Sequence, residues 1–126
     1  MMQRQSHVKR PHPGETRLDA LQRHAFDYFL NETNLANGLV ADKSQPGAPA
    51  SIAAVGFALA AYPVGVERAW ISRISAIDRA LAALRFFSNA PQGTDPDTTG
   101  HKGFFYHFLD MTTGRRAGIC ELSTVD

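Results

Sequence analysis

The sequence predicts a mainly α-helical domain, and three observations support this fold class. Residues 16–32 and 72–88 carry apolar residues at the three- and four-residue spacing of a helix, and residues 52–62 form an apolar run rich in small residues. Thr16 and Ser51 are side chains suited to cap the first two of these helices. The alternation typical of a strand is confined to residues 103–119, which are predicted to form a C-terminal β-hairpin lying on the helices.

The first predicted helix begins after Thr16, and Asp19 completes a capping box with it. Residues 1–15 mix Pro, His and Arg without periodicity, so they are predicted to be a disordered tail. The domain is therefore assigned to residues 16–126. The apolar stripe of the first helix consists of Leu18, Leu21, Ala25 and Phe29, widened by Phe26 and Leu30.

The second predicted helix, residues 52–62, is apolar on all sides, so neighbours must cover most of it. Pro63 is expected to end this helix. The segments 34–50 and 94–100 carry the turn residues of loops. The apolar stripe of the third helix consists of Ile74, Ile77, Leu81, Leu84 and Phe87.

Composition narrows the class of protein. With 126 residues, 44% hydrophobic and 20% charged, the chain has the composition of one globular domain. A net charge of +1 gives no support for nucleic-acid binding, and no segment is long enough to span a membrane. Without a secretory signal at its start the chain is predicted to be cytoplasmic. One cysteine and scattered histidines predict no metal site, and no cofactor is expected.

The last four residues, 123–126, have the pattern of a capping box that opens a helix. A cap without a helix contributes nothing to stability, so the pattern predicts a domain that is truncated at its C-terminal end.

Four strings resemble the bacterial glucoamylase-like family, which includes β-1,2-glucanases and a domain of cyclic β-1,2-glucan synthases. The resemblance covers residues 17–126 and implies an (α/α)6 toroid around a glucan-binding cleft. Twelve helices with their loops need roughly 200 residues, so the chain is expected to form an incomplete segment of the toroid, with three helices and a C-terminal β-hairpin. The strings are ASIAAVGFALAAYPVGVERAWISR (50–73), LRFFSNAPQG (84–93), GFFYHFLDMTTGRRA (103–117) and CELSTVD (120–126).

The chain departs from the family pattern at Gly118-Ile119, where relatives commonly carry a Trp-Asn pair. Replacing an aromatic and an amide side chain at these positions either removes a contact to the sugar or only changes the packing of the cleft wall.

Glycoside hydrolysis uses two carboxyl groups across the scissile bond, and Glu121 and Asp126 are the catalytic candidates. Between Cys120 and Leu122, Glu121 is expected to have an apolar surround that raises its pKa for general-acid work. The alternative is a glutamate that accepts backbone N–H bonds at the turn. Asp126 is first of all the capping partner of Ser123, and second a residue of the cleft.

Four further residues are candidates for substrate binding: Tyr106, His107, Asp110 and Trp70. Alternation puts Tyr106 and His107 on opposite faces, so at most one of the two is expected to face the cleft. Asp110 precedes a turn and can instead accept bonds from turn amides. Trp70 can equally be a buried anchor. Arg115 and Arg116 are expected to be solvated or paired with a carboxylate.

The resemblance implies inverting hydrolysis of a β-glucan, with β-1,2-glucan first among the substrates. The second carboxyl group is expected from later helices, so the chain alone is expected to be inactive. An alternative hypothesis is a non-catalytic module that binds glucan or a protein through the apolar face of residues 52–62, which also allows self-association. A third is a gene fragment without independent function. Glucan linkage and endo or exo action stay open.

Overall fold

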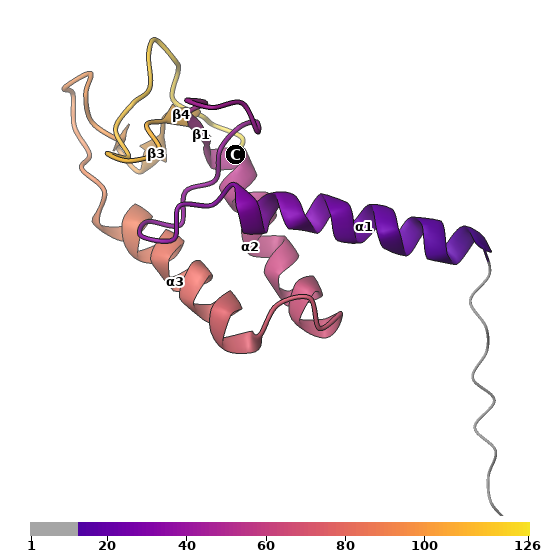
Figure 1. Cartoon of the computed structure of the whole chain (residues 1–126). Helices are drawn as coiled ribbons and strands as arrows, with labels where there is room; N and C mark the ends of the chain where they lie inside the picture. Colours follow the sequence, from indigo (N-terminus) through magenta and orange to yellow (C-terminus); the bar gives the residue numbers. More distant parts are fainter. Residues whose placement is uncertain (1–12) are drawn as a thin grey trace, which may run out of the picture.

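The computed structural model of the chain describes residues 13–126. The tail predicted for residues 1–15 lies outside the described residues except for 13–15, which are helical. The mainly α class is confirmed, because three helices are accompanied by small two-stranded sheets only (Figure 1). The elements are α1 (Pro13–Asn31), β1 (Ala50–Ser51), α2 (Ile52–Glu67), α3 (Arg73–Asn89), β2 (Gly100–His101), β3 (Phe104–Phe105) and β4 (Phe108–Leu109).

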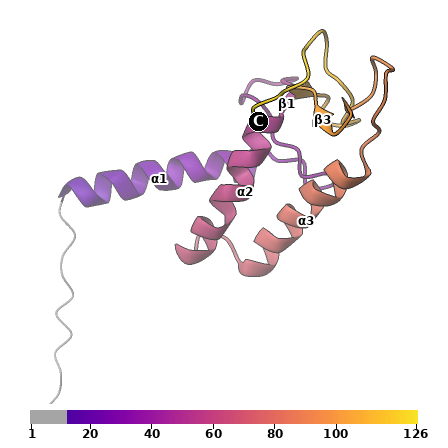
Figure 2. The same ribbon diagram turned by 180° about the vertical axis from the view of Figure 1, so that it is seen from behind.

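Helix α1 begins at Pro13, three residues before the predicted cap, so the capping box of Thr16 and Asp19 is wrong. Proline fits the first turn of a helix because the N–H it lacks would have no partner there. Asp19 instead accepts a hydrogen bond of 2.9 Å from Arg68, which follows α2. The first half of α1 projects away from the other elements (Figures 1 and 2). Its apolar Leu18 and Leu21 are consequently exposed.

The predicted cap of α2 is confirmed, since the Ser51 hydroxyl accepts a bond of 3.3 Å from the Ala54 amide. The prediction that Pro63 ends this helix is wrong, because α2 continues to Glu67. Proline removes one backbone donor, but Pro63 lies on the exposed side of α2. The Arg68 amide then closes the helix on the carbonyl of Val64 at 2.9 Å.

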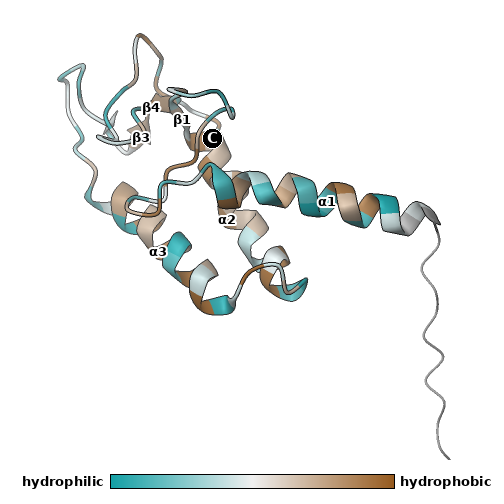
Figure 3. Cartoon of the chain, in the orientation of Figure 1, coloured by the Kyte–Doolittle hydropathy of each residue, from teal (hydrophilic) through white to brown (hydrophobic). Residues whose placement is uncertain are grey.

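Helix α3 faces α2 with small residues such as the buried Ala76, while the buried Ala83 packs against Gly38 of the loop of residues 32–49. Small side chains let the two helices approach closely, so the larger apolar residues of α3 are not needed at this contact. The predicted stripe is present in α3, but Ile74, Ile77 and Leu84 are exposed. Figure 3 shows brown and teal segments alternating along both α1 and α3.

The predicted C-terminal hairpin forms only at its turn. Leu109 bridges to Arg116, and the Asp110 amide bonds the Arg115 carbonyl at 2.7 Å. The strands of this segment pair elsewhere, β4 antiparallel with β1 in the register Ala50↔Leu109, and β3 antiparallel with β2. The C-terminal region is therefore held against the start of α2, where the C-terminus lies in Figures 1 and 2.

The loop of residues 32–49 contributes to the core. Its Leu39 and Val40 are fully buried, together with Val55 and Tyr62 of α2 and Leu109 of β4. No helix among residues 13–126 is long and apolar enough to cross a membrane.

Candidate functional site

Residues 120–126 run back along residues 105–107, which brings four of the predicted site residues together. The Ser123 amide donates to the Phe105 carbonyl at 2.8 Å, and the His107 amide donates to the Glu121 carbonyl at 3.0 Å. Tyr106 forms an antiparallel bridge with Leu122. Glu121 and Asp126 therefore belong to the same segment pair as Tyr106 and His107.

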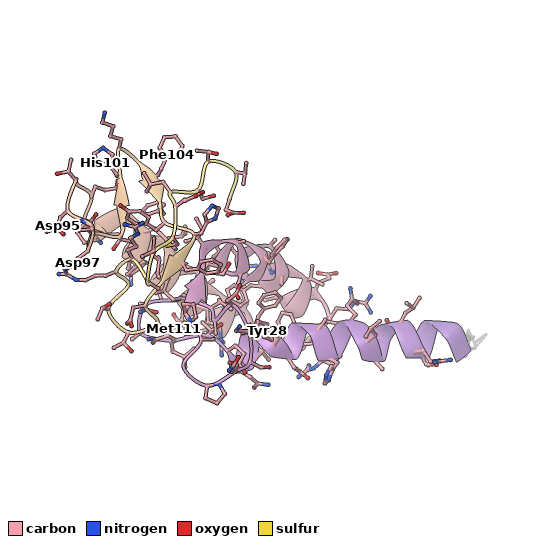
Figure 4. The ribbon with its side chains drawn as sticks, turned by 90° about the horizontal axis from the view of Figure 1, so that it is seen from above. Tyr28, Asp95, Asp97, His101, Phe104 and Met111 are labelled. Atoms are coloured by element: carbon pink, nitrogen blue, oxygen red, sulfur yellow. The ribbon has the colours of Figure 1, made fainter. Side chains whose placement is uncertain are left out.

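Tyr106 and His107 face opposite sides of this segment pair, as alternation predicts. Tyr106 lines a hollow of about 250 Å³ together with Leu122, His101, Gly93 and Thr94. His101 and its neighbour Phe104 lie at the end of the molecule remote from α1 (Figure 4).

On the other side, His107 contacts the carboxylate of Asp126 with its Nδ1, at 3.0 Å from Oδ2. An ionised carboxylate can only accept hydrogen bonds, so Nδ1 carries the proton in this contact. Nε2 of a neutral His107 ring is then left as an acceptor.

Asp126 is also held by Ser123, whose side chain is buried. The Ser123 hydroxyl donates to Asp126 Oδ2 at 2.9 Å and accepts from the Asp126 amide at 3.0 Å. The serine half of the predicted capping box is thus formed. The reciprocal half is not, because the Ser123 amide bonds Phe105 instead of the carboxylate. Asp126 therefore combines the capping role with a contact to His107.

Glu121 differs from its expectation. Its side chain is exposed, so the described residues do not form the apolar surround predicted for a general acid. Its backbone is well fixed, since its carbonyl accepts from His107 and the preceding Cys120 carbonyl accepts from Nη2 of Arg116. The segment carrying Glu121 is ordered, while the carboxylate itself meets solvent.

Arg116 has a position that the sequence did not reveal. It is half-buried rather than solvated, and its guanidinium carbon lies 4.5 Å from the centre of the Tyr106 ring. Its Nε is buried without a hydrogen-bond partner. The expected carboxylate does not pair with Arg116 within residues 13–126, and the guanidinium donates to the Cys120 carbonyl instead. One face of Tyr106 is therefore covered by a cation, which leaves the hollow as the approach for a ligand.

Asp110 orders the turn, as its alternative role predicts, and it also lines a hollow of about 490 Å³ with Pro49 and Gly118. Its Oδ1 accepts from the amides of Thr112 at 2.8 Å and Thr113 at 2.7 Å. These hydrogen bonds to the ionised form lower the pKa of Asp110 below its ordinary value, against a smaller opposing effect of desolvation.

Trp70 lies away from the other candidates. It follows the C-terminal end of α2, whereas His107 contacts the N-terminal end of that helix. The Ile52 amide at the start of α2 bonds the His107 carbonyl at 3.2 Å. The 16 residues of α2 then span about 24 Å. The Trp70 ring packs on Phe26 at 5.4 Å, with Arg23 and Arg68 above it at 5.6 and 5.7 Å. These contacts match the anchor interpretation of Trp70.

The two sides of this segment pair therefore offer different chemistry. One side has the hollow with the aromatic wall of Tyr106. The other side has the carboxylate–histidine pair, together with the exposed carboxylate of Glu121, which lies opposite His107 in the pairing. In the part of the chain that the structure describes, no group of three or more His, Cys, Asp and Glu side chains could hold a metal ion.

The chain matches no protein-family model and has no match among curated proteins. Two solved structures are similar to it. The "putative glucoamylase" of Bacteroides uniformis has 29% sequence identity and a TM-score of 0.67, with 84% of this chain and 24% of that chain covered. The "putative glucoamylase" of Bacteroides fragilis has 21% identity and a TM-score of 0.64, with 88% and 26% covered. The chain therefore shares its fold with part of these proteins and spans about a quarter of their length.

Proposed function

We propose that residues 16–126 are the N-terminal portion of a glycoside-hydrolase-like (α/α) domain that acts on a β-glucan and is inactive alone. The similarity to the Bacteroides uniformis protein carries this proposal, because it extends over 84% of the chain at 29% identity. A protein named as a glucoamylase belongs to the enzymes that cleave glycosidic bonds. The β-1,2 linkage and the inverting outcome rest on the resemblance of residues 17–126 to β-1,2-glucanases.

In this proposal Glu121 is the general acid and Asp126 is ordered by His107. An acid that protonates a glycosidic oxygen must reach the bond, and the exposure of Glu121 supports such access. A sugar unit next to Glu121 would meet His107, which lies on the same face, and the hollow beside Tyr106 on the other face would contact a different unit of the glucan. The bound sugar and the rest of the domain would then provide the apolar surround that Glu121 lacks here.

Inactivity of the chain follows from the need for two carboxyl groups. An inverting pair stands about 6.5–9.5 Å apart with a water between them. Asp126 already accepts hydrogen bonds from Ser123 and His107, so its carboxylate is engaged in local order. The second carboxyl group is therefore assigned to a part of the domain beyond residues 16–126.

Two measurements on the purified chain test this proposal. Incubation with β-1,2-glucan should release no oligosaccharide above the level of a protein-free control. Titration with β-1,2-gluco-oligosaccharides, followed by NMR of the Tyr106 and His107 signals, should give shifts that α-1,4- and β-1,3-linked oligosaccharides of equal length do not give.

Glu121→Gln should weaken this binding about tenfold, the scale of one hydrogen bond to a charged group. Glu67→Gln, an exposed glutamate at the end of α2, is the matched control and should leave it unchanged. Measurable hydrolysis would refute the claim of inactivity. Equal response to all three linkages, or none to any, would refute the assignment of β-1,2-glucan.

A second candidate function is a non-catalytic module that binds through α2, and one observation favours it. Phe57 of α2 has 69% of its surface exposed in the predicted contact face. If α2 is the contact element, Phe57→Ser should abolish glucan or protein binding while Glu121→Gln leaves it intact. The opposite pattern would assign binding to the C-terminal segment.

A further inference from the structure

Helix α3 presents an unpartnered apolar seam on its outer side. Ile74, Ile77, Leu81 and Leu84 follow one another at spacings of three, four and three residues. This is the a–d spacing that lets one helix pack along another. Their exposed fractions are 74%, 45%, 37% and 55%. We define these four side chains as the α3 seam.

The fold of the chain leaves the α3 seam open because α2 contacts a different face of α3. That contact includes the buried Ala76, and the buried Ala83 packs against Gly38 of the loop of residues 32–49, so neither alanine belongs to the seam. Between α2 and the seam lies a groove of about 360 Å³ whose lining is mostly apolar and includes Leu59, Pro63 and Ile77. The seam and the groove together form one surface that can accept a helix.

The charged residues beside the seam indicate which helix fits. With Ile74 and Leu81 at a positions, Arg73 takes a g position and Asp78 an e position. In two parallel helices in register, a g residue faces the e residue five positions later on the partner. Arg73 of one copy thus faces Asp78 of the other, twice across a two-fold axis. Both side chains are exposed, and neither forms an ion pair within residues 13–126.

We propose that the α3 seam is the docking surface for a second copy of this chain, packed in parallel with two Arg73–Asp78 ion pairs. This inference concerns residues 1–126 as an isolated chain. In the larger domain of the proposed function, other helices of that domain are the competing occupant of the seam, and a chain that stays monomeric would favour them over a second copy. A net charge of +1 gives little repulsion between copies. A stable dimer buries roughly 800 Å² on each partner, more than four side chains supply, so the dimer also uses the groove and is weak.

A lipid surface fits this helix less well. Helices that lie on membranes carry many basic residues on their polar face. Helix α3 has no lysine, Asp78 interrupts its arginines, and Arg79 turns inward to the Phe29 carbonyl at 3.4 Å.

Sedimentation equilibrium of the purified chain over a wide concentration range tests the proposal. The native chain should show a reversible monomer–dimer equilibrium. Leu81→Glu should raise the dissociation constant at least tenfold, about 1.4 kcal/mol. Leu21→Glu is the matched control, since Leu21 of α1 is 64% exposed but lies outside the seam. It should leave the constant unchanged.

Charge reversal tests the parallel arrangement. Arg73→Glu and Asp78→Arg should each weaken the dimer about threefold to fivefold, the scale of exposed ion pairs. The double variant should restore it. Glutamate also suits the first residue of α3, so loss of the dimer in Arg73→Glu could not be attributed to loss of the helix.

The other outcomes overturn the proposal. They are a chain that stays monomeric at its highest soluble concentration, a dimer that tolerates Leu81→Glu, and a double variant as weak as the single ones. Flotation with phosphatidylcholine–phosphatidylglycerol vesicles that is lost in Leu81→Glu would assign the seam to lipid instead.

Discussion

Two glycines in the same helix predict opposite effects of the same substitution. Gly56 and Gly65 both lie within α2. A Cβ built on Gly56 meets no atom within 4 Å, and this position is exposed. A Cβ built on Gly65 would lie 2.2 Å from the Phe26 ring and 2.9 Å from Ile71, and this position is buried. Alanine therefore fits at position 56 and clashes at position 65.

The magnitudes follow from two effects. Replacing glycine by alanine inside a helix stabilises it by about 0.5–1 kcal/mol, because the unfolded chain has less freedom to lose. Gly56→Ala should gain this amount. At Gly65 the same gain is opposed by overpacking, which costs about 1–3 kcal/mol. The Phe26 ring must shift, and since it is buried against Trp70 it has no free space to enter. Gly65→Ala should therefore destabilise the chain by about 1 kcal/mol net of that gain, and by at most about 2.5 kcal/mol.

Urea unfolding and the fluorescence of Trp70, the one tryptophan of the chain, measure both effects. The two midpoints should move in opposite directions. The emission of Trp70 should shift to longer wavelength in Gly65→Ala only, because displacing Phe26 opens one face of the indole. If Gly65→Ala is as stable as Gly56→Ala and its emission is unchanged, the packing of α1 on α2 through Phe26 is wrong.

Two further predictions concern the C-terminal loops. Asp110→Ala should lower stability at neutral pH, because Thr112 and Thr113 lose their acceptor. The folded pKa of Asp110 is lowered, so its stabilisation is complete above the unfolded pKa of about 3.9 and is lost as the pH falls through the folded pKa. Urea unfolding at neutral and strongly acidic pH should show the gap to the native chain closing in acid. Thr99 is fully buried, and its hydroxyl donates to the Gly114 carbonyl at 2.8 Å. Thr99→Val should lower the free energy of unfolding by about 1–3 kcal/mol, because the buried Gly114 carbonyl loses this donor. Thr99→Ser, which keeps the hydroxyl, should unfold closer to the native midpoint than Thr99→Val, and an equal loss in both variants would contradict the role of this hydrogen bond.

The helices could be predicted from the sequence because helical hydrogen bonds and caps are local. Ser51 caps α2 as its position before an apolar run predicts, and α3 matches its predicted range to within a residue. The boundaries that failed depend on context. Proline at position 63 leaves the carbonyl four residues earlier without its helical donor, but Pro63 lies on the exposed side of α2, where water can supply a hydrogen bond instead, so the helix continues. Which face of α3 packs also depends on its partner.

The strand partners could not be predicted, since they are distant in the sequence. Residues 103–119 have the alternation and turn of a hairpin, yet Leu109 pairs with Ala50, and Phe105 pairs with Gly100. Alternation fixes which residues share a face, and Tyr106 and His107 do face opposite sides. It does not fix the partner strand. Arg116 on Tyr106 was missed for the same reason, because nothing in their ten-residue separation places the cation above the ring.

The two proposals concern opposite parts of the molecule and can be tested separately. The proposed glucan site lies in the C-terminal segment, where hydrogen bonds from Ser123, His107 and Arg116 already order the backbone. The α3 seam lies on the outer side of α3, where its four apolar side chains are exposed. Substitutions in the seam should therefore change association and leave oligosaccharide binding intact, and Glu121→Gln should do the reverse. If Leu81→Glu abolished both, the two surfaces would be coupled and the sugar would bind only to the dimer.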